Sequence, residues 1–196
     1  EGHVPSISTP LKITEFDIKD SVENYYYSVE NYYYFVETLH EDALMDCRQA
    51  KKIILPDGVT SVGERAFTGC SSLTNIRIPN SVISIGDRAF MGCASLTSIA
   101  IPDGVTSIGD GAFSGCSGLT SITLPGSVTS IGELAFADCE RLASIALPTG
   151  ITSIGDWAFS GRTGLASLAL PDEVTNIGGG LFSFCTGLTS ATLPVG

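Results

Sequence analysis

Apolar residues recur along most of this chain at a fixed interval of 23 positions. Written in rows of that length, residues 51–196 share the pattern x-x-I-x-(I/L)-P-x-x-V-x-x-I-G-x-x-A-F-x-x-C-x-x-L. One unit of this size cannot bury its apolar face alone, whereas stacked units can. The pattern therefore predicts a β-dominated α/β repeat solenoid. Its rows begin at Lys51, Thr74, Thr97, Thr120, Ala143 and Ala166, and a partial row runs from Thr189 to Gly196.

Each recurring position predicts part of one coil. Ile76 and Ile78 alternate as the inward side chains of a short strand, which the following proline ends because it has no amide hydrogen to donate. Gly86 and its equivalents are expected at positive φ in a sharp turn. Ala89 and Phe90 are expected to form one tight helical turn whose Phe fills the core. Stacking about 4.8 Å apart would then give a parallel sheet on the concave face, with short helical turns and an irregular return path on the convex side.

The run LTSIAIPDGVTSIGDGAFSGC at 96–116 resembles the BspA-type, or Treponema-type, leucine-rich repeats. The resemblance covers residues 51–196 and implies a right-handed leucine-rich-repeat superhelix. Members of this family are typically secreted or surface-attached proteins of host-associated bacteria and some protists, and many act as adhesins or antigens. The resemblance therefore implies an extracellular or cell-surface location. The family has no shared active site, so it implies no catalytic residue.

Residues 1–50 depart from the pattern and are predicted to cap the first coil. They contain the duplication SVENYYY at 21–27 and 28–34, followed by a degenerate repeat. Valines at heptad spacing favour a helix over 21–46, although Tyr runs also favour strands. A Tyr-rich binding surface is the alternative to a cap. Residues 51–188 then form six 23-residue repeats and 189–196 a truncated final repeat, whose open end allows a homodimer.

Charge and hydropathy exclude two classes of partner. The 196 residues carry 10 Lys and Arg against 21 Asp and Glu, a formal net charge of −11, so nucleic acid is not expected to bind. No apolar run approaches the ~20 residues that span a bilayer, so membrane insertion is not expected. Six of the bases cluster, which indicates a solvated face that balances nearby acids or, alternatively, a docking patch for an acidic partner. They are Arg48, Lys51, Lys52, Arg65, Arg77 and Arg88.

Three further kinds of residue recur with the same 23-residue period: cysteines, carboxylates, and Ser with Thr. The cysteines are interpreted as a buried ladder of free thiols, because side chains one coil apart point the same way at a separation too long for a disulfide. The carboxylates after each glycine are interpreted as caps of the helical turns, with a row of calcium sites as the alternative. Stacked Ser and Thr suit an exposed surface, with ice binding as the alternative. The carboxylates are Glu64, Asp87, Asp110, Glu133 and Asp156.

Catalytic, metal and cofactor sites are not predicted. The two histidines, His3 and His40, lie outside the regular coils, so no nucleophile–histidine pair is suggested. The cysteine spacing does not match a zinc motif, and no phosphate-binding loop is present.

Partner-binding residues are predicted where the repeat varies while its frame holds. Lys52, Asn75 and Arg77 flank the inward Ile of the strands, and a second group follows each glycine by two positions: Arg65, Arg88, Leu134 and Trp157. Trp and Arg dominate measured interface hot spots. The predicted function is a non-catalytic binding or adhesion module of a secreted or cell-surface protein, with a protein or glycan ligand. A passive structural spacer of a larger surface protein is the alternative, and a cation-dependent solenoid is a third.

Overall fold

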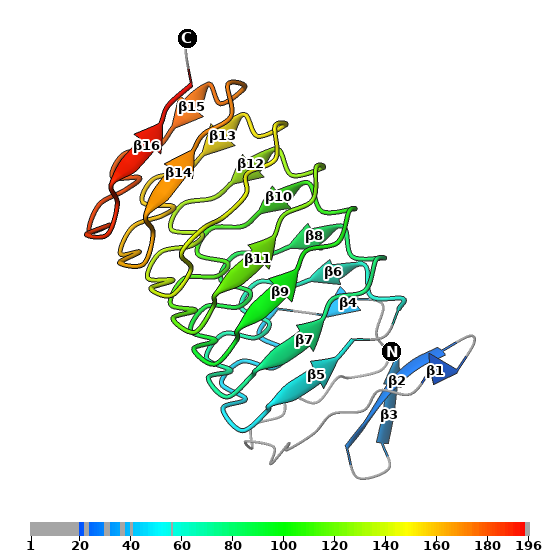
Figure 1. The fold of residues 1–196 in the computed structure, drawn as a ribbon. Coiled ribbons are helices and arrows are strands. Elements are labelled where there is room, and N and C mark those ends of the chain that lie inside the picture. The colour runs from blue at the N-terminus through cyan, green and yellow to red at the C-terminus, as the bar shows by residue number, and fades with distance from the viewer. Residues whose placement is uncertain are drawn as a thin grey trace.

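The computed structural model describes residues 20–21, 24–29, 32–35, 38–39, 41–55 and 57–194. From residue 51 onward the chain winds as a solenoid in which each coil passes first through a short front strand and then through a two-residue back strand, except that residues 143–147 form no front strand (Figure 1). The first pass is a three-residue strand whose middle residue is buried in all but the last coil. These front strands are β5 (Lys52–Ile54), β7 (Asn75–Arg77), β9 (Ser98–Ala100), β11 (Ser121–Thr123), β14 (Ser167–Ala169) and β16 (Ser190–Thr192).

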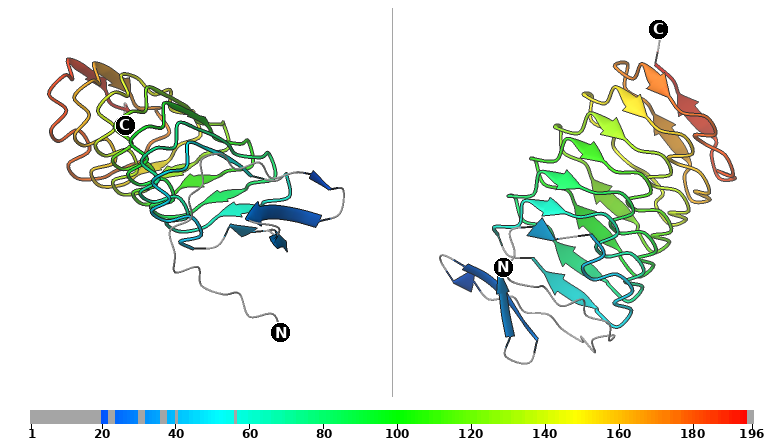
Figure 2. Two further views of the ribbon diagram at one scale, coloured as in Figure 1. Left: turned by 90° about the horizontal axis from the view of Figure 1, so that it is seen from below. Right: turned by 180° about the vertical axis from the view of Figure 1, so that it is seen from behind.

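The return path is not irregular as predicted, because it carries a second parallel sheet. This seven-stranded sheet joins residues 23 positions apart, such as Ser107 with Ser130 and Ser130 with Ser153. Figure 2 shows it from behind. Its strands, in spatial order, are β15 (Asn176–Ile177), β13 (Ser153–Ile154), β12 (Ser130–Ile131), β10 (Ser107–Ile108), β8 (Ser84–Ile85), β6 (Ser61–Val62) and β4 (Thr38–Leu39).

The predicted helical turns, and with them the α/β class, are wrong. The described residues contain no helix, so the protein is a β-solenoid. Each Ala-Phe segment is a turn enclosed by two left-handed residues, for example Arg88 (φ 54°) and Gly92 (φ 72°). The Phe90 N–H donates to Ala112 O of the next coil at 2.8 Å, whereas Ala89 N–H bonds within its own turn to Gly86 O at 3.3 Å. A helix would keep all these bonds within the segment, so bonding to the next coil replaces it.

The predicted positive φ at the recurring glycines is also wrong. Gly86 and Gly155 do not have positive φ, and the left-handed residue of each coil lies two positions later. Glycine is needed there because adjacent coils approach so closely. A Cβ on Gly86 would lie 2.7 Å from Glu64 N and 2.9 Å from Gly63 C of the preceding coil. Close backbone approach, a recognised use of glycine, explains the column.

The core is a set of parallel columns of like side chains. The six turn phenylalanines stack, with centroid separations that increase from 5.0 Å between Phe67 and Phe90 to 6.5 Å between Phe159 and Phe182. Four ladder cysteines are fully buried, and each donates its thiol hydrogen to the carbonyl 26 residues earlier, as Cys93 does to Phe67 O at 3.2 Å. All six cysteines are free, as predicted, and four of them form the predicted buried ladder, whereas Cys47 and Cys185 are half-buried.

Arg162 replaces cysteine in the ladder and is completely buried. Its Nη2 donates to Leu142 O at 2.6 Å, and its guanidinium carbon lies 5.3 Å from the Phe159 ring centre. Nε and Nη1 have no hydrogen-bond acceptor among the described residues. Burial lowers the pKa of Arg162 to about 10, so the side chain is still charged at neutral pH. Residues 143–147, directly after Leu142, form no front strand, unlike the equivalent residues of the other five repeats.

The helix favoured over residues 21–46 is not formed by the described residues of that range. Instead, β1 (Asp20–Ser21), β2 (Asn24–Val29) and β3 (Tyr32–Phe35) make an antiparallel sheet in which the two copies of the duplication pair, with Tyr27 opposite Tyr34. The strand preference of the Tyr runs outweighs the heptad spacing. Figures 1 and 2 place this sheet at the end of the solenoid where β4 and β5 lie.

We expect thiol labelling of the native protein to be confined to two cysteines. Cys47 and Cys185 are half-buried, whereas the other four are fully buried. The neighbouring Cys93 thiol and burial raise the pKa of Cys116 well above its usual value. Because alkylation needs an accessible thiolate, iodoacetamide should modify Cys47 and Cys185 in the native protein and leave the four buried thiols unmodified. Peptide mass spectrometry should find all six alkylated only after unfolding, and rapid native labelling of Cys116 would contradict this arrangement.

Candidate binding surfaces

The second position after each recurring glycine forms a column along one edge of the turns, in which Arg88, Leu134 and Trp157 are exposed. We call it the turn-edge column, and its members are Arg65, Arg88, Gly111, Leu134, Trp157 and Gly180. All six residues have left-handed backbone, with φ between 53° and 65°. This conformation is unfavourable for every residue except glycine, by roughly 1–2 kcal/mol. Gly111 and Gly180 show that glycine is accommodated in the column. The four larger side chains therefore carry a backbone conformational cost that glycine avoids.

Two of the four large side chains, Arg88 and Trp157, pack against the glycine at the equivalent position of the next coil. A Cβ on Gly180 would lie 2.7–2.8 Å from three atoms of the Trp157 ring, so the indole covers that glycine. Arg88 does the same with its stem, since its Cγ would be 3.3 Å from a Cβ on Gly111. Leu134 and Trp157 still expose 39% and 41% of their surface. The column is therefore apolar and exposed in coils four and five and basic in coils one and two.

The four arginines of the basic cluster pair with neighbouring acids. Arg65 contacts Asp42 at 2.8 Å and Glu41 at 2.7 Å, and Asp42 raises the pKa of the guanidinium further. Arg77 contacts Asp57 at 2.8 Å. These pairs support the interpretation of the bases as a solvated face in charge balance. Exposed pairs of this kind contribute little to stability, typically about 0–1 kcal/mol.

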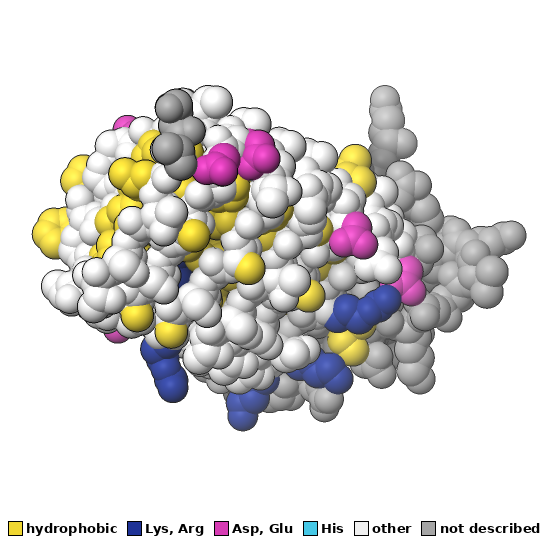
Figure 3. All heavy atoms as spheres, turned by 45° about the horizontal axis from the view of Figure 1, so that its top comes forward, with side chains coloured by type: hydrophobic (Ala, Val, Ile, Leu, Met, Phe, Trp, Pro, Cys, Tyr) yellow, Lys and Arg dark blue, Asp and Glu magenta, His cyan; other side chains and the backbone are white. Residues whose placement is uncertain are grey.

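The predicted binding residues fall into two groups on different elements. Lys52, Asn75 and Arg77 are exposed on β5 and β7, where Lys52 lies beside Asn75 in the ladder. The other four lie in the turn-edge column, after the strands of the seven-stranded sheet. In Figure 3 most Lys and Arg side chains lie in the lower part of the view and most Asp and Glu side chains in the upper part, with hydrophobic side chains between them.

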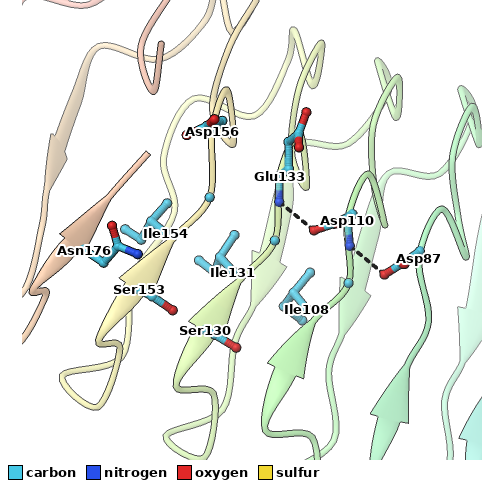
Figure 4. Close-up of a pocket in the computed structure, with 13 residues that line it drawn as sticks. Asp87, Ile108, Asp110, Ser130, Ile131, Glu133, Ser153, Ile154, Asp156 and Asn176 are labelled. Atoms are coloured by element: carbon cyan, nitrogen blue, oxygen red, sulfur yellow. Dashed lines mark hydrogen bonds between the residues drawn. The ribbon is translucent and has the colours of Figure 1, made fainter. Parts of the chain in front are cut away.

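A hollow of about 470 Å³ lies over the seven-stranded sheet, and we call it the acidic groove (Figure 4). Ile108, Ile131 and Ile154 point inward beneath it, while polar side chains of the strands and the following carboxylates line it. The sequence predicted the carboxylates but not the groove, because the second sheet was not predicted. The polar lining residues are Asp87, Asp110, Ser130, Glu133, Ser153, Asp156 and Asn176.

Three of the five carboxylates bridge coils, and none caps a helical turn, because the described residues contain no helix. Asp87 Oδ1 accepts the Asp110 N–H at 2.9 Å, Asp110 Oδ1 accepts the Glu133 N–H at 2.8 Å, and Asp156 Oδ1 accepts the Gly179 N–H at 2.7 Å. Within the ranges that the structure describes, no group of three or more His, Cys, Asp or Glu side chains is arranged to hold a metal ion. Each of these aspartates therefore fastens one coil to the next through the backbone.

These features define a two-sheet parallel β-solenoid with exposed, variable edges. Its sequence matches the BspA type leucine rich repeat region in six copies, over residues 37–140 and 83–196. The chain belongs to this leucine-rich-repeat family, as the resemblance predicted. Leucine-rich-repeat proteins of this kind are commonly surface proteins and protein-interaction modules.

Solved structures support the same assignment. A leucine-rich-repeat protein of T. pallidum is 30% identical, with a TM-score of 0.76 over 93% of this chain and 91% of that one. A leucine rich cell surface protein of Faecalibacterium prausnitzii is 26% identical, with a TM-score of 0.54 over 85% of this chain and 67% of that one. The pneumococcal vaccine antigen PcpA, 20% identical with a TM-score of 0.52 over 74% of this chain and 52% of that one, shares the fold. No curated protein matches the chain at a significant level. None of the described residues belongs to a helix long and apolar enough to cross a membrane.

Proposed function

We propose that this chain is a non-catalytic adhesion module of a secreted or cell-surface protein, which binds a host or neighbouring-cell protein or glycan. Leu134 and Trp157, with the arginines of the turn-edge column, form one candidate contact, and Lys52, Asn75 and Arg77 on β5 and β7 form a second. The similarity to a leucine rich cell surface protein supports the location. A passive spacer within a larger surface protein is the competing function.

The backbone conformation of the turn-edge column carries the proposal. Trp157 and Leu134 are large, exposed and left-handed, at positions where Gly111 and Gly180 avoid the conformational cost. Exposed side chains that carry a backbone conformational cost are best explained by a role outside folding. An aromatic ring beside an aliphatic side chain supplies the type of anchor found at interface hot spots. A spacer has no need of either.

We expect Trp157→Gly to abolish binding without destabilising the fold. Glycine removes the indole and relieves the left-handed strain, so the free energy of unfolding should stay within about 1 kcal/mol of the wild-type value or increase. Immobilised wild-type and variant proteins would be compared against extracellular-matrix proteins and a glycan array, with calorimetry as the stability control.

Arg77→Glu tests the strand group in the same experiment. Saturable wild-type binding that Arg77→Glu weakens and Trp157→Gly abolishes would support the module. A panel in which no member binds, or in which Trp157→Gly binds as well as the wild type, would favour a spacer function or a different surface.

A further inference from the structure

The floor of the acidic groove carries hydrogen-bonding groups that the fold does not use. Ser130, Ser153 and Asn176 lie in register on β12, β13 and β15, and their side chains have no hydrogen-bond partner within the described part of the chain. The preceding residues behave differently, since Thr152 Oγ1 donates to Thr129 O at 3.3 Å. One column of hydroxyls is therefore used between coils, while its neighbour remains available to a ligand.

The groove also has one sign of charge. Asp87, Asp110, Glu133 and Asp156 line it, and no Lys, Arg or His of the described residues does. Each aspartate accepts a backbone N–H of the next coil with one carboxylate oxygen, which leaves its second oxygen for a ligand. The Glu133 carboxylate extends away from the sheet and has no ion-pair partner among the described residues (Figure 4).

The surroundings of the groove strengthen this charge. Residues 131–194 include six acids and two bases, of which Arg162 is buried and only Arg141 is exposed. The arginines of the N-terminal half are committed to ion pairs there. A groove of one charge sign favours a ligand of the opposite sign and speeds its encounter.

We infer that the acidic groove binds an extended, Lys- and Arg-rich segment of a partner protein, which lies along the solenoid axis across β10, β12 and β13. The carboxylates follow the axis at one per coil, about 4.8 Å apart, so an extended chain that rises about 3.3 Å per residue passes all four within a few residues. Long basic side chains reach the carboxylates, while the Ser and Asn side chains hydrogen-bond to the backbone of the segment. This inference rests on the proposed binding function and adds a second surface to it.

The test uses a peptide of about 12 residues with alternating Lys and Ser, and a Gln-Ser peptide of equal length as the uncharged control. We expect the double variant Asp110→Asn/Glu133→Gln to bind the Lys-Ser peptide about fivefold to tenfold more weakly in fluorescence anisotropy. The amide that replaces the Asp110 carboxylate keeps an oxygen that can accept the backbone N–H of residue 133, so the coil contact is retained. The matched control is Asp172→Asn/Glu173→Gln, which removes two charges outside the groove lining.

Three outcomes would overturn the inference. The first is an equal loss of affinity in both double variants, which would mean that net charge alone determines binding. The second is a Gln-Ser peptide that binds as tightly as the Lys-Ser peptide. The third is a wild-type protein that does not bind the Lys-Ser peptide. Trp157→Gly separates the two proposals, because it removes turn-edge binding and leaves every groove carboxylate in place. A Lys-Ser affinity that depends on the groove acids and not on Trp157 supports the groove even if the matrix-protein panel fails.

Discussion

Gly155→Ala should destabilise the protein by roughly 3 kcal/mol, which lowers the melting temperature by about 6–12 °C. Gly155 lies where two coils meet at the edge of the acidic groove. An alanine Cβ there would lie 2.5 Å from Glu133 N and 2.6 Å from Gly132 C, both backbone atoms of the preceding coil. Backbone cannot move aside as a flexible side chain can, so the coils must separate and strain the hydrogen bonds between them. Thermal and urea unfolding would measure the loss.

Gly126→Ala is the matched control for this prediction. Gly126 is exposed, its φ is not left-handed, and no atom lies within 4 Å of an added Cβ. The same substitution there should change the free energy of unfolding by less than about 1 kcal/mol. Similar losses in the two variants would mean that coil approach does not explain the glycine column.

Arg162→Cys should stabilise the protein by about 1–4 kcal/mol. Cysteine restores the ladder residue, removes a buried cation with two unsatisfied donors and supplies a thiol that can donate to the carbonyl 26 residues earlier. Residues 143–147 should then form a front strand between β11 and β14. Urea unfolding measures the first effect, and slower amide hydrogen exchange of 143–147, compared with residues 121–123, measures the second.

Arg162→Lys is the control, because it keeps a buried cation and loses the planar group that contacts Phe159. It should be no more stable than the wild type. A lower stability of Arg162→Cys would show that the bond to Leu142 O and the ring contact outweigh the cost of burying the charge.

The repeat made much of the core predictable. Ile76 and its equivalents alternate with exposed residues at a two-residue period, and the Phe and Cys positions recur every 23 residues. These patterns depend only on which side chains must be buried, and burial is the strongest signal that a sequence carries. The family assignment follows from the same residues.

The predictions failed where bonding between coils determines the local conformation. Ala89-Phe90 has no local feature that distinguishes a helical turn from a turn bonded to the next coil, and the two-residue strands are too short to have a visible period. A glycine that recurs at the position of Gly86 indicates only that a side chain is not tolerated there. Positive φ and close approach of another backbone segment explain such a glycine equally well. The acidic groove depends on the second sheet, so only its carboxylates could be recognised in advance.

The contacts between coils join equivalent positions 23 residues apart, as between Asp87 and Asp110 or Thr129 and Thr152. Loss or gain of one whole repeat therefore brings together surfaces that already fit each other. Recombination between repeats in the gene would yield folded proteins of different lengths without new packing problems. Each added coil would lengthen the acidic groove by one carboxylate, so the reach of this surface toward a partner can change by unit steps.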